Sequence, residues 1–322
     1  MQDMMNMTEF VEKLKDEVRE YLPEDVRGDI IIDDVEVVKM NDQKLHGLTF
    51  KTPDSDAAPT LYVDDMFSAY KDGMDIGELT AELANMYTGS RGGVRPPEVK
   101  LSYDRVKDNL TVRLLEKKRN NEFLSSMPYV NVGHGLAVIA DINMGENGGG
   151  DWRIAVNNNV LEQLGVDRET LFADAMKNSA IVEPAMLVDM NNALFEPQMV
   201  NLLERDEPIS PKNVGGMYVL TNASRSLGAA AMFYPDVKEK AAEIIGGDYY
   251  ILPSSCHEVI LVPDTLEVKA KDLCEMVKEA NRTVVEDKDI LSDNVYHYSK
   301  DERRLDKVTQ NRELGDRVAE GR

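Results

Sequence analysis

Two stretches of this chain share the same order of apolar, glycine and acidic residues, and this likeness constrains the fold more than any other feature. The matched strings, which lie at one common offset, are GLAVI (135–139) with GMYVL (216–220), and LEQLGVD (161–167) with AEIIGGD (242–248). In each stretch an apolar run typical of a buried strand comes before an amphipathic segment typical of a helix. The sequence therefore predicts that residues 135–167 and 216–248 are two copies of one β-hairpin-plus-helix unit. Chance similarity between amphipathic segments is the alternative.

The other segments of this larger part of the chain also alternate between strand and helix patterns. Expected strands lie at 135–142, 152–156, 216–221, 227–233, 249–252 and 257–262, and expected helices at 158–164, 167–179, 235–246 and 268–280. The glycine-rich string GENGGG (145–150) could suggest a phosphate-binding loop. Such a loop needs a helix after it, whose N-terminus faces the anion. Because the strand-like string DWRI follows instead, a hairpin loop is the better interpretation.

The first 90 residues form a separate pattern. Residues 8–22 have apolar side chains near the 3.6-residue period of a helix that Thr8 could cap. Strand-like segments at 30–38 and 45–50 predict a hairpin, and a further helix should begin near Asp75 and end at Gly89. The string GSRGGVRPP (89–97) is typical of a linker.

These patterns predict an α+β fold with a helix-plus-hairpin subdomain at the N-terminus and a larger body made of the two similar units. The expected boundaries are 1–90 for the N-terminal subdomain, 91–127 for a linker and connecting segment, 128–210 for the first unit, 211–282 for the second, and 283–322 for a partly mobile C-terminal extension.

Composition excludes several classes of protein. Apolar residues make up 42% of the 322 residues, which is enough for a real core, but no apolar run approaches the length of a membrane span. The first residues lack the basic and apolar regions of a secretory signal. The only cysteines, Cys256 and Cys274, cannot form a disulfide framework, and Cys274 lies on an apolar helical stripe. We expect a protein of the reducing cytoplasm.

The net charge of −22 comes from 59 acidic and 37 basic residues. Such a field repels the phosphates of nucleic acids and of anionic membranes, so ordinary binding to either is disfavoured. Solubility is the simplest explanation of the charge. The alternative is an acidic decoy that mimics nucleic acid and binds a basic protein.

Reactive residue types are dense in one place, the string SSCHE (254–258). If this string is a strand, alternation places Ser255 and His257 on one face, where a serine nucleophile with a histidine base is conceivable. The strained G-x-S-x-G elbow of serine hydrolases is missing, however. Ser254, Ser255, His257 and Glu258 are instead candidates for ligand contact, or for a turn in which the serines bond to the backbone and His257 is held in a network.

No metal site or cofactor site is predicted. The four histidines are scattered along the chain, with no H-E-x-x-H string and no paired cysteines. The acid pairs Asp33-Asp34 and Asp64-Asp65 lack the spacing of a calcium loop and are typical of a solvated surface.

Four strings together resemble one family of bacterial proteins of unknown function that is common in gut Firmicutes. They are LHGLTF (45–50), MYVLTNASRSLGAAAMFYPDV (217–237), GGDYYILPSSCHEVILVPD (246–264) and LSDNVYHYSKDE (291–302). The resemblance runs from about residue 8 to 302. A more distant similarity to the YtpQ-type family passes through the same ILPSS string and through residues 152–179. The resemblance implies a bacterial cytoplasmic origin and supplies no catalytic residues.

The leading hypothesis is therefore a non-enzymatic cytoplasmic binding or regulatory protein whose partner is a protein or a small ligand. A hydrolase-like enzyme that uses Ser255 and His257 is the first alternative, and the acidic decoy is the second.

Overall fold

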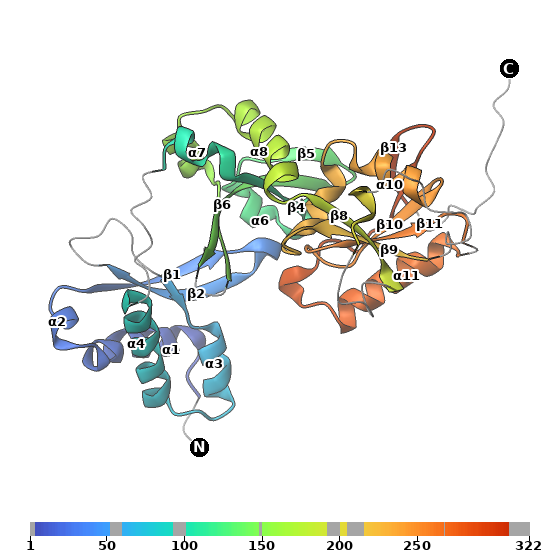
Figure 1. The fold of residues 1–322 in the computed structure, drawn as a ribbon. Helices are drawn as coiled ribbons and strands as arrows, with labels where there is room; N and C mark the ends of the chain where they lie inside the picture. Colours follow the sequence, from blue (N-terminus) through green and yellow to red (C-terminus); the bar gives the residue numbers. More distant parts are fainter. Residues whose placement is uncertain are drawn as a thin grey trace. The chain divides into compact units, whose positions relative to one another are not determined.

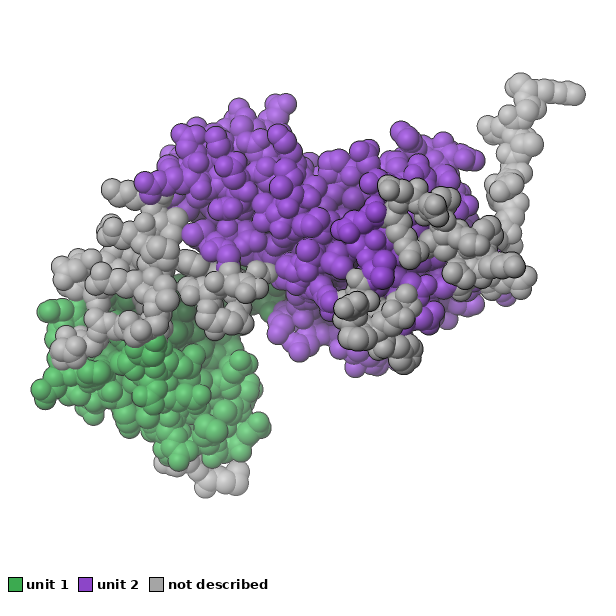
Figure 2. All heavy atoms as spheres, in the orientation of Figure 1, with its two compact units in different colours: residues 1–100 green, residues 101–322 purple. Residues whose placement is uncertain are grey.

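The computed structural model describes residues 4–51, 60–92, 101–147, 150–191, 200–204, 216–266 and 268–308. The chain divides into two compact units, residues 1–100 and residues 101–322 (Figures 1 and 2). Each unit combines helices with antiparallel sheets, which confirms the α+β prediction. Among the described helices, none has the length and apolar character needed to cross a membrane.

Unit 1 is a three-stranded antiparallel sheet with helices packed against it. Its elements are α1 (Met7–Tyr21), α2 (Glu24–Arg27), β1 (Ile31–Val38), η1 (Met40–Asp42), β2 (Lys44–Lys51), β3 (Thr60–Tyr62), α3 (Asp64–Lys71) and α4 (Ile76–Gly92). The predicted hairpin is confirmed, because β1 and β2 pair along their whole length. The cap of α1 is Asn6 rather than Thr8, since Asn6 and Glu9 bond each other's backbone in a capping box. Gly89 lies inside α4 rather than after its end.

Unit 2 holds most of the chain's core. Its helices and short 3-10 turns are α5 (Tyr103–Val106), η2 (Lys107–Asn109), η3 (Lys117–Arg119), α6 (Asn121–Ser125), α7 (Asn158–Leu164), α8 (Arg168–Val182), η4 (Leu202–Glu204), η6 (Gly228–Phe233), α10 (Val237–Ile245), α11 (Ala270–Thr283) and η7 (Asp287–Asp289). Its strands are β4 (Leu110–Glu116), β5 (Val130–Gly133), β6 (Leu136–Asn147), β7 (Gly150–Ala155), β8 (Ala185–Asp189), β9 (Tyr218–Asn222), β10 (Tyr249–Pro253), β11 (Val259–Pro263), β12 (Tyr296–Ser299) and β13 (Arg304–Lys307).

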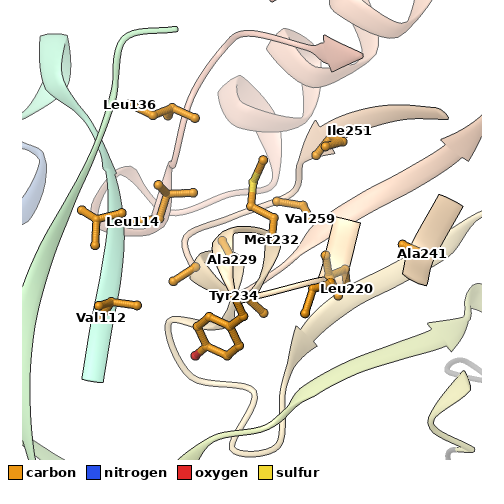
Figure 3. Packing of buried hydrophobic residues seen from close by; sticks show 14 of the residues in the cluster. Val112, Leu114, Leu136, Leu220, Ala229, Met232, Tyr234, Ala241, Ile251 and Val259 are labelled. Carbon is orange, nitrogen blue, oxygen red and sulfur yellow. The ribbon is translucent and has the colours of Figure 1, made fainter. Parts of the chain in front are cut away.

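These strands form two antiparallel sheets that share one apolar core. The first has the order β4-β6-β5, with β7 also paired to β6, and the second has the order β13-β12-β10-β11-β9-β8. Figure 3 shows how the core is shared: side chains of η6, such as Met232, lie among those of β4 and those of β9 and β11. Unit 2 is therefore held together by burial of apolar side chains that come from both sheets.

The predicted repeat is reproduced only in part. Residues 135–167 form the expected hairpin of β6 and β7 followed by α7. The described residues of GENGGG, 145–147 and 150, belong to these two strands, and residues 148 and 149 lie outside the described part of the chain. In residues 216–248, however, β9 is followed by the 3-10 helix η6 and then by α10. The predicted strand at 227–233 is wrong, and β9 pairs with β8 and β11 instead. The reason is local, because the three alanines of η6 favour helical over extended backbone.

Three predicted boundaries also differ from the structure. Residues 101–127 are more than a connection, because they supply the buried strand β4. The stretches 128–210 and 211–282 are not separate units, since β8 and β9 pair within one sheet. In the C-terminal extension, residues 296–307 contain β12, which pairs with β10, and the edge strand β13, while residues 309–322 lie outside the described part of the chain.

Candidate functional site

Residues 254–258 form the loop between β10 and β11 rather than a strand. The ladder between the two strands ends at the pair Pro253 and Val259, and the loop is closed by a bond from Ser255 N to Glu258 O of 3.2 Å. Proline has no backbone N–H with which to continue a ladder. The alternation argument for Ser255 and His257 therefore does not apply.

The imidazole of His257 is held by two neighbours. The backbone N–H of Leu227 donates to Nδ1 over 3.1 Å, and Nε2 lies 3.3 Å from Oδ1 of Asp289. Because an amide nitrogen only donates, Nδ1 must accept, and the ring proton must be on Nε2, where it faces the carboxylate. Leu227 adopts a left-handed backbone conformation (φ 55°) where it makes this bond. Both ring nitrogens are thus engaged, in one defined tautomer.

The serines of the loop bond to other groups than the imidazole. Oγ of Ser255 accepts a bond of 3.0 Å from the backbone N–H of His257, and Oγ of Ser254 donates to Glu258 over 3.4 Å. The structure thus gathers all four candidates in one loop. A serine nucleophile needs its hydroxyl bonded to the base, and the hydrogen bonds of the described residues do not join Ser255 to the ring. They favour the turn-and-network interpretation of this loop.

Cys256 is the buried residue of the same loop. Its N–H donates to the carbonyl of Asp289 over 2.7 Å, and its thiol lies 3.8 Å from Oδ1 of that residue. Burial, reinforced by the negative charge of Asp289, raises the pKa of the Cys256 thiol to about 12. Burial also raises the pKa of Cys274, which lies on the apolar face of α11 as predicted. Both are neutral thiols near neutral pH.

We expect both cysteines to resist alkylation in the folded protein. Since the thiolate is the reactive species, a pKa of about 12 at Cys256 should slow its labelling by roughly 1,000-fold or more relative to the unfolded chain. Mass spectrometry after iodoacetamide treatment, with and without denaturant, measures this. Rapid labelling of Cys256 in the native state would contradict the assignment of a buried, protonated thiol.

A cavity of about 300 Å³ is lined in part by η7, the segment whose Asp289 bonds to the loop at 254–258. Its lining comes from η3, α11, η7 and the residues that follow η7, and it consists of Arg119, Lys278, Asn281, Arg282, Asp287, Ile290 and Asp293. We call these seven residues the α11 pocket. Sequence reasoning missed it. The one available signal was the pair Lys278 and Arg282, which one helical turn places on the same face of α11.

Asp293 and Arg119 form an ordered wall of the α11 pocket. The guanidinium of Arg119 reaches Asp293 over 3.2 Å, and the amide of Asn281 donates to the other oxygen of Asp293 over 2.8 Å. Burial works to raise the pKa of Asp293, but the hydrogen bond from Asn281 and the charges of Arg119 and Lys278 outweigh it and leave that pKa below its ordinary value. Asp293 is therefore ionised and fixed in place.

The other two cations of the pocket are less constrained. Within the described part of the chain, Lys278 has no carboxylate at ion-pair distance. Arg282 pairs with Glu279, but both side chains are mostly exposed, and such surface pairs contribute about 0–1 kcal/mol. Lys278 and Arg282 can therefore turn their donors towards an incoming anion at little cost.

The α11 pocket is connected through the chain to the loop at 254–258. Asp287 and Ile290 line the pocket, while Asp289 between them bonds to Cys256 and His257. A displacement of η7 would therefore change both the α11 pocket and the loop at 254–258.

A second polar cluster lies deep inside unit 2. Arg153 of β7 pairs with Glu183 at the end of α8, and both side chains are about 95% buried, with exposures of 6% and 5%. The carboxylate of Glu183 also accepts bonds from the amides of Asn143 (3.0 Å) and Asn222 (2.7 Å). Its acceptor positions are thus occupied by protein groups, which is typical of a structural network.

Comparisons with known proteins place the chain in one family and identify no activity. No curated protein and no solved structure matches it. The model of a family described as a family of unknown function, DUF5688, matches residues 7–300. That match reaches into both units, from the start of α1 to the end of β12. The chain therefore belongs to the DUF5688 family.

Proposed function

We propose that this protein is a non-enzymatic binding protein that takes a small anionic compound, a carboxylate or a phosphate, into the α11 pocket. The observation that carries the proposal is the presence of three cations around one cavity in a chain whose net charge is −22. Two carboxylates, Asp287 and Asp293, also line the cavity, so its lining has a small excess of positive charge. On such a chain, a local excess of cations favours an anion that the rest of the surface repels.

The size and charge pattern of the pocket support a small ligand. A cavity of about 300 Å³ is at the lower end of the range for small-molecule sites. Lys278 and Arg282 would supply charge-assisted bonds to the anionic end of the ligand. The carboxylates of Asp287 and Asp293 would repel a second anionic group, so they favour a ligand whose other end bears hydroxyl or ammonium donors.

The remaining features of the proposal rest on the sequence. The resemblance described above supports a bacterial protein, and the cysteine usage supports the cytoplasm. Binding without catalysis is supported by two hydrogen bonds. Oγ of Ser255 accepts from the backbone N–H of His257 rather than bonding to its imidazole, and Nδ1 of that imidazole accepts from Leu227.

A binding experiment tests the pocket directly. Calorimetric titration with inorganic phosphate and with lactate, whose single carboxylate is accompanied by a hydroxyl group, should detect binding to the full chain, and affinity should fall as salt rises. The double variant Lys278→Gln/Arg282→Gln should bind at least tenfold more weakly, because each charge-assisted bond contributes about 1.5–3 kcal/mol and about 1.4 kcal/mol corresponds to tenfold.

Lys271→Gln is the matched control. Lys271 lies on the same helix and pairs with Glu275 at the surface, but it does not line the pocket. Its loss changes the net charge without changing the site, so the affinity should stay close to that of the unaltered protein. Equal weakening by Lys271→Gln and by the double variant would show a diffuse charge effect and overturn the proposal. Failure of both anions to bind would overturn it as well.

A further inference from the structure

Three metal-ligating side chains from separate parts of unit 2 meet at one end of β10. Asp248 comes directly before β10, Asp264 directly after β11, and His297 lies in β12. The strand register brings them together, since Tyr249 pairs with Pro263 and Tyr250 pairs with His297. One ligand atom from each of the three residues lies within 4.8 Å of the other two.

The hydrogen bonds that the structure shows for these residues leave one carboxylate oxygen without a partner. Nε2 of His297 lies 3.1 Å from Oδ2 of Asp264, and the backbone N–H of Lys300 donates to Oδ1 of Asp248 over 2.9 Å. Oδ1 of Asp264 is buried, and none of the residues that the structure describes forms a hydrogen bond with it. A buried carboxylate oxygen without a partner costs free energy, which a bound cation would recover.

The imidazole of His297 is also fixed in place. Its side chain is 11% exposed, and the ring meets that of Tyr250 edge to face, with centroids 4.9 Å apart. Asp248 and Asp264 are only partly buried, so solvent reaches the donors from their side. The arrangement combines a rigid nitrogen donor with two carboxylates and an open approach.

We propose that Asp248, Asp264 and His297 form a binding site for a divalent transition metal ion. Two carboxylate oxygens and one imidazole nitrogen suit ions such as Mn²⁺ and Zn²⁺. With metal–ligand distances of about 2.0–2.2 Å, neighbouring ligand atoms lie roughly 3–3.5 Å apart. The 3.1 Å between His297 and Asp264 meets this requirement without backbone movement. Three protein ligands leave further coordination positions for water or a ligand.

A second group of possible metal ligands has similar spacing but is less suited to bind an ion. Cys256, His257 and Asp289 also place their ligand atoms within 4.8 Å of one another. The amide of Leu227, however, keeps the proton of His257 on Nε2, the nitrogen that would have to bind the metal. A metal-bound histidine carries its proton on the other nitrogen and donates it. For His297, the described residues show no amide that donates to Nδ1, so the proton can move there and free Nε2.

Metal binding by the full chain, freed of metal with a chelator, tests the site. Equilibrium dialysis against Mn²⁺ and against Zn²⁺, each in physiological salt with excess Mg²⁺, should give one ion per chain for at least one of the two metals. The same metal should raise the thermal unfolding temperature. Asp264→Asn and His297→Gln should each weaken binding by about 100-fold or more, since loss of even an outer partner costs 10–100-fold.

His257→Gln and Asp289→Asn are the matched controls, because they make the same changes in the group that we expect not to bind metal. Asp248→Asn, which alters a partly exposed donor, keeps the test informative if His297→Gln fails to fold. Absence of binding to the unaltered chain, binding by Asp248→Asn and Asp264→Asn as tight as that of the unaltered chain, or loss of binding in His257→Gln would each overturn the proposal. The α11 pocket shares no residue with this site, so anion binding and metal binding can fail independently.

Discussion

Replacing Glu183 with glutamine should lower the free energy of unfolding of unit 2 by about 3–5 kcal/mol, the usual cost of removing one partner from a buried ion pair. The side chains of Glu183 and Arg153 are about 95% buried, so water cannot replace the lost carboxylate. The variant keeps nearly the same shape, and what changes is the charge. The guanidinium of Arg153 would stay in the interior without its counter-ion.

Loss of the Glu183 carboxylate should weaken contacts between several elements of unit 2. Its carboxylate joins β7 through Arg153, β6 through Asn143 and β9 through Asn222, while its own backbone ends α8. Both sheets of unit 2 therefore meet at this one side chain.

Urea unfolding followed by circular dichroism, with hydrogen exchange of peptides from unit 2, measures the loss. Glu162→Gln is the control, because Glu162 is an exposed residue of α7 and its change should stay within about 0.5 kcal/mol. A second variant, Arg153→Met, should be much less harmful when combined with Glu183→Gln than the two single effects together predict. If Glu183→Gln behaves like Glu162→Gln, the network contributes nothing to stability.

Gly228→Ala should destabilise unit 2 by about 1–3 kcal/mol or more, as overpacking of a tight core does. A Cβ atom at residue 228 would lie 2.3 Å from Oγ1 of Thr221, 2.6 Å from the backbone N of Asn222 and 2.7 Å from the carbonyl of His257. Two of these atoms belong to backbone, so no rotation of a side chain can make room. One strand end or one loop must move.

The same substitution should loosen the loop at 254–258. The hydroxyl of Thr221 donates to the carbonyl of His257 over 2.8 Å, next to the place where the new methyl group would lie. Hydrogen exchange of peptides that span this loop should therefore accelerate. Gly247→Ala is the control, because a Cβ atom there meets nothing within 4 Å. Equal stabilities of the two variants would contradict the close packing around Gly228.

Much of the fold could be predicted because its signals are local. The apolar run of β6 and the apolar stripe of α11 each indicate which side chains leave water, and the structure buries those side chains. Cys274 follows from the same stripe. The strand expected at 227–233 failed because a short apolar run has no period that distinguishes strand from buried helix. There, the helix propensity of the alanines favours η6 over a strand.

The candidate sites could be predicted from the sequence less well than the fold. The string at 254–258 is contiguous, so its residues could be found by reading the chain, but what each side chain bonds to depends on Leu227 and Asp289, which lie far away in sequence. The α11 pocket and the group of Asp248, Asp264 and His297 draw residues from elements separated along the chain. Their residue types occur everywhere on an acidic protein, so spacing alone cannot select them.

The sequence by itself determined the class of fold, the apolar faces of its main strands and helices, and the neutral surroundings of Cys274. These follow from short-range periodicity and from the tendency of apolar side chains to leave water. Only the tertiary structure decided which strands pair, which tautomer His257 adopts, and which charged groups share one cavity. Hydrogen bonds and charge pairs between distant segments depend on angles and distances of a few ångströms, which the order of residues along the chain does not encode locally.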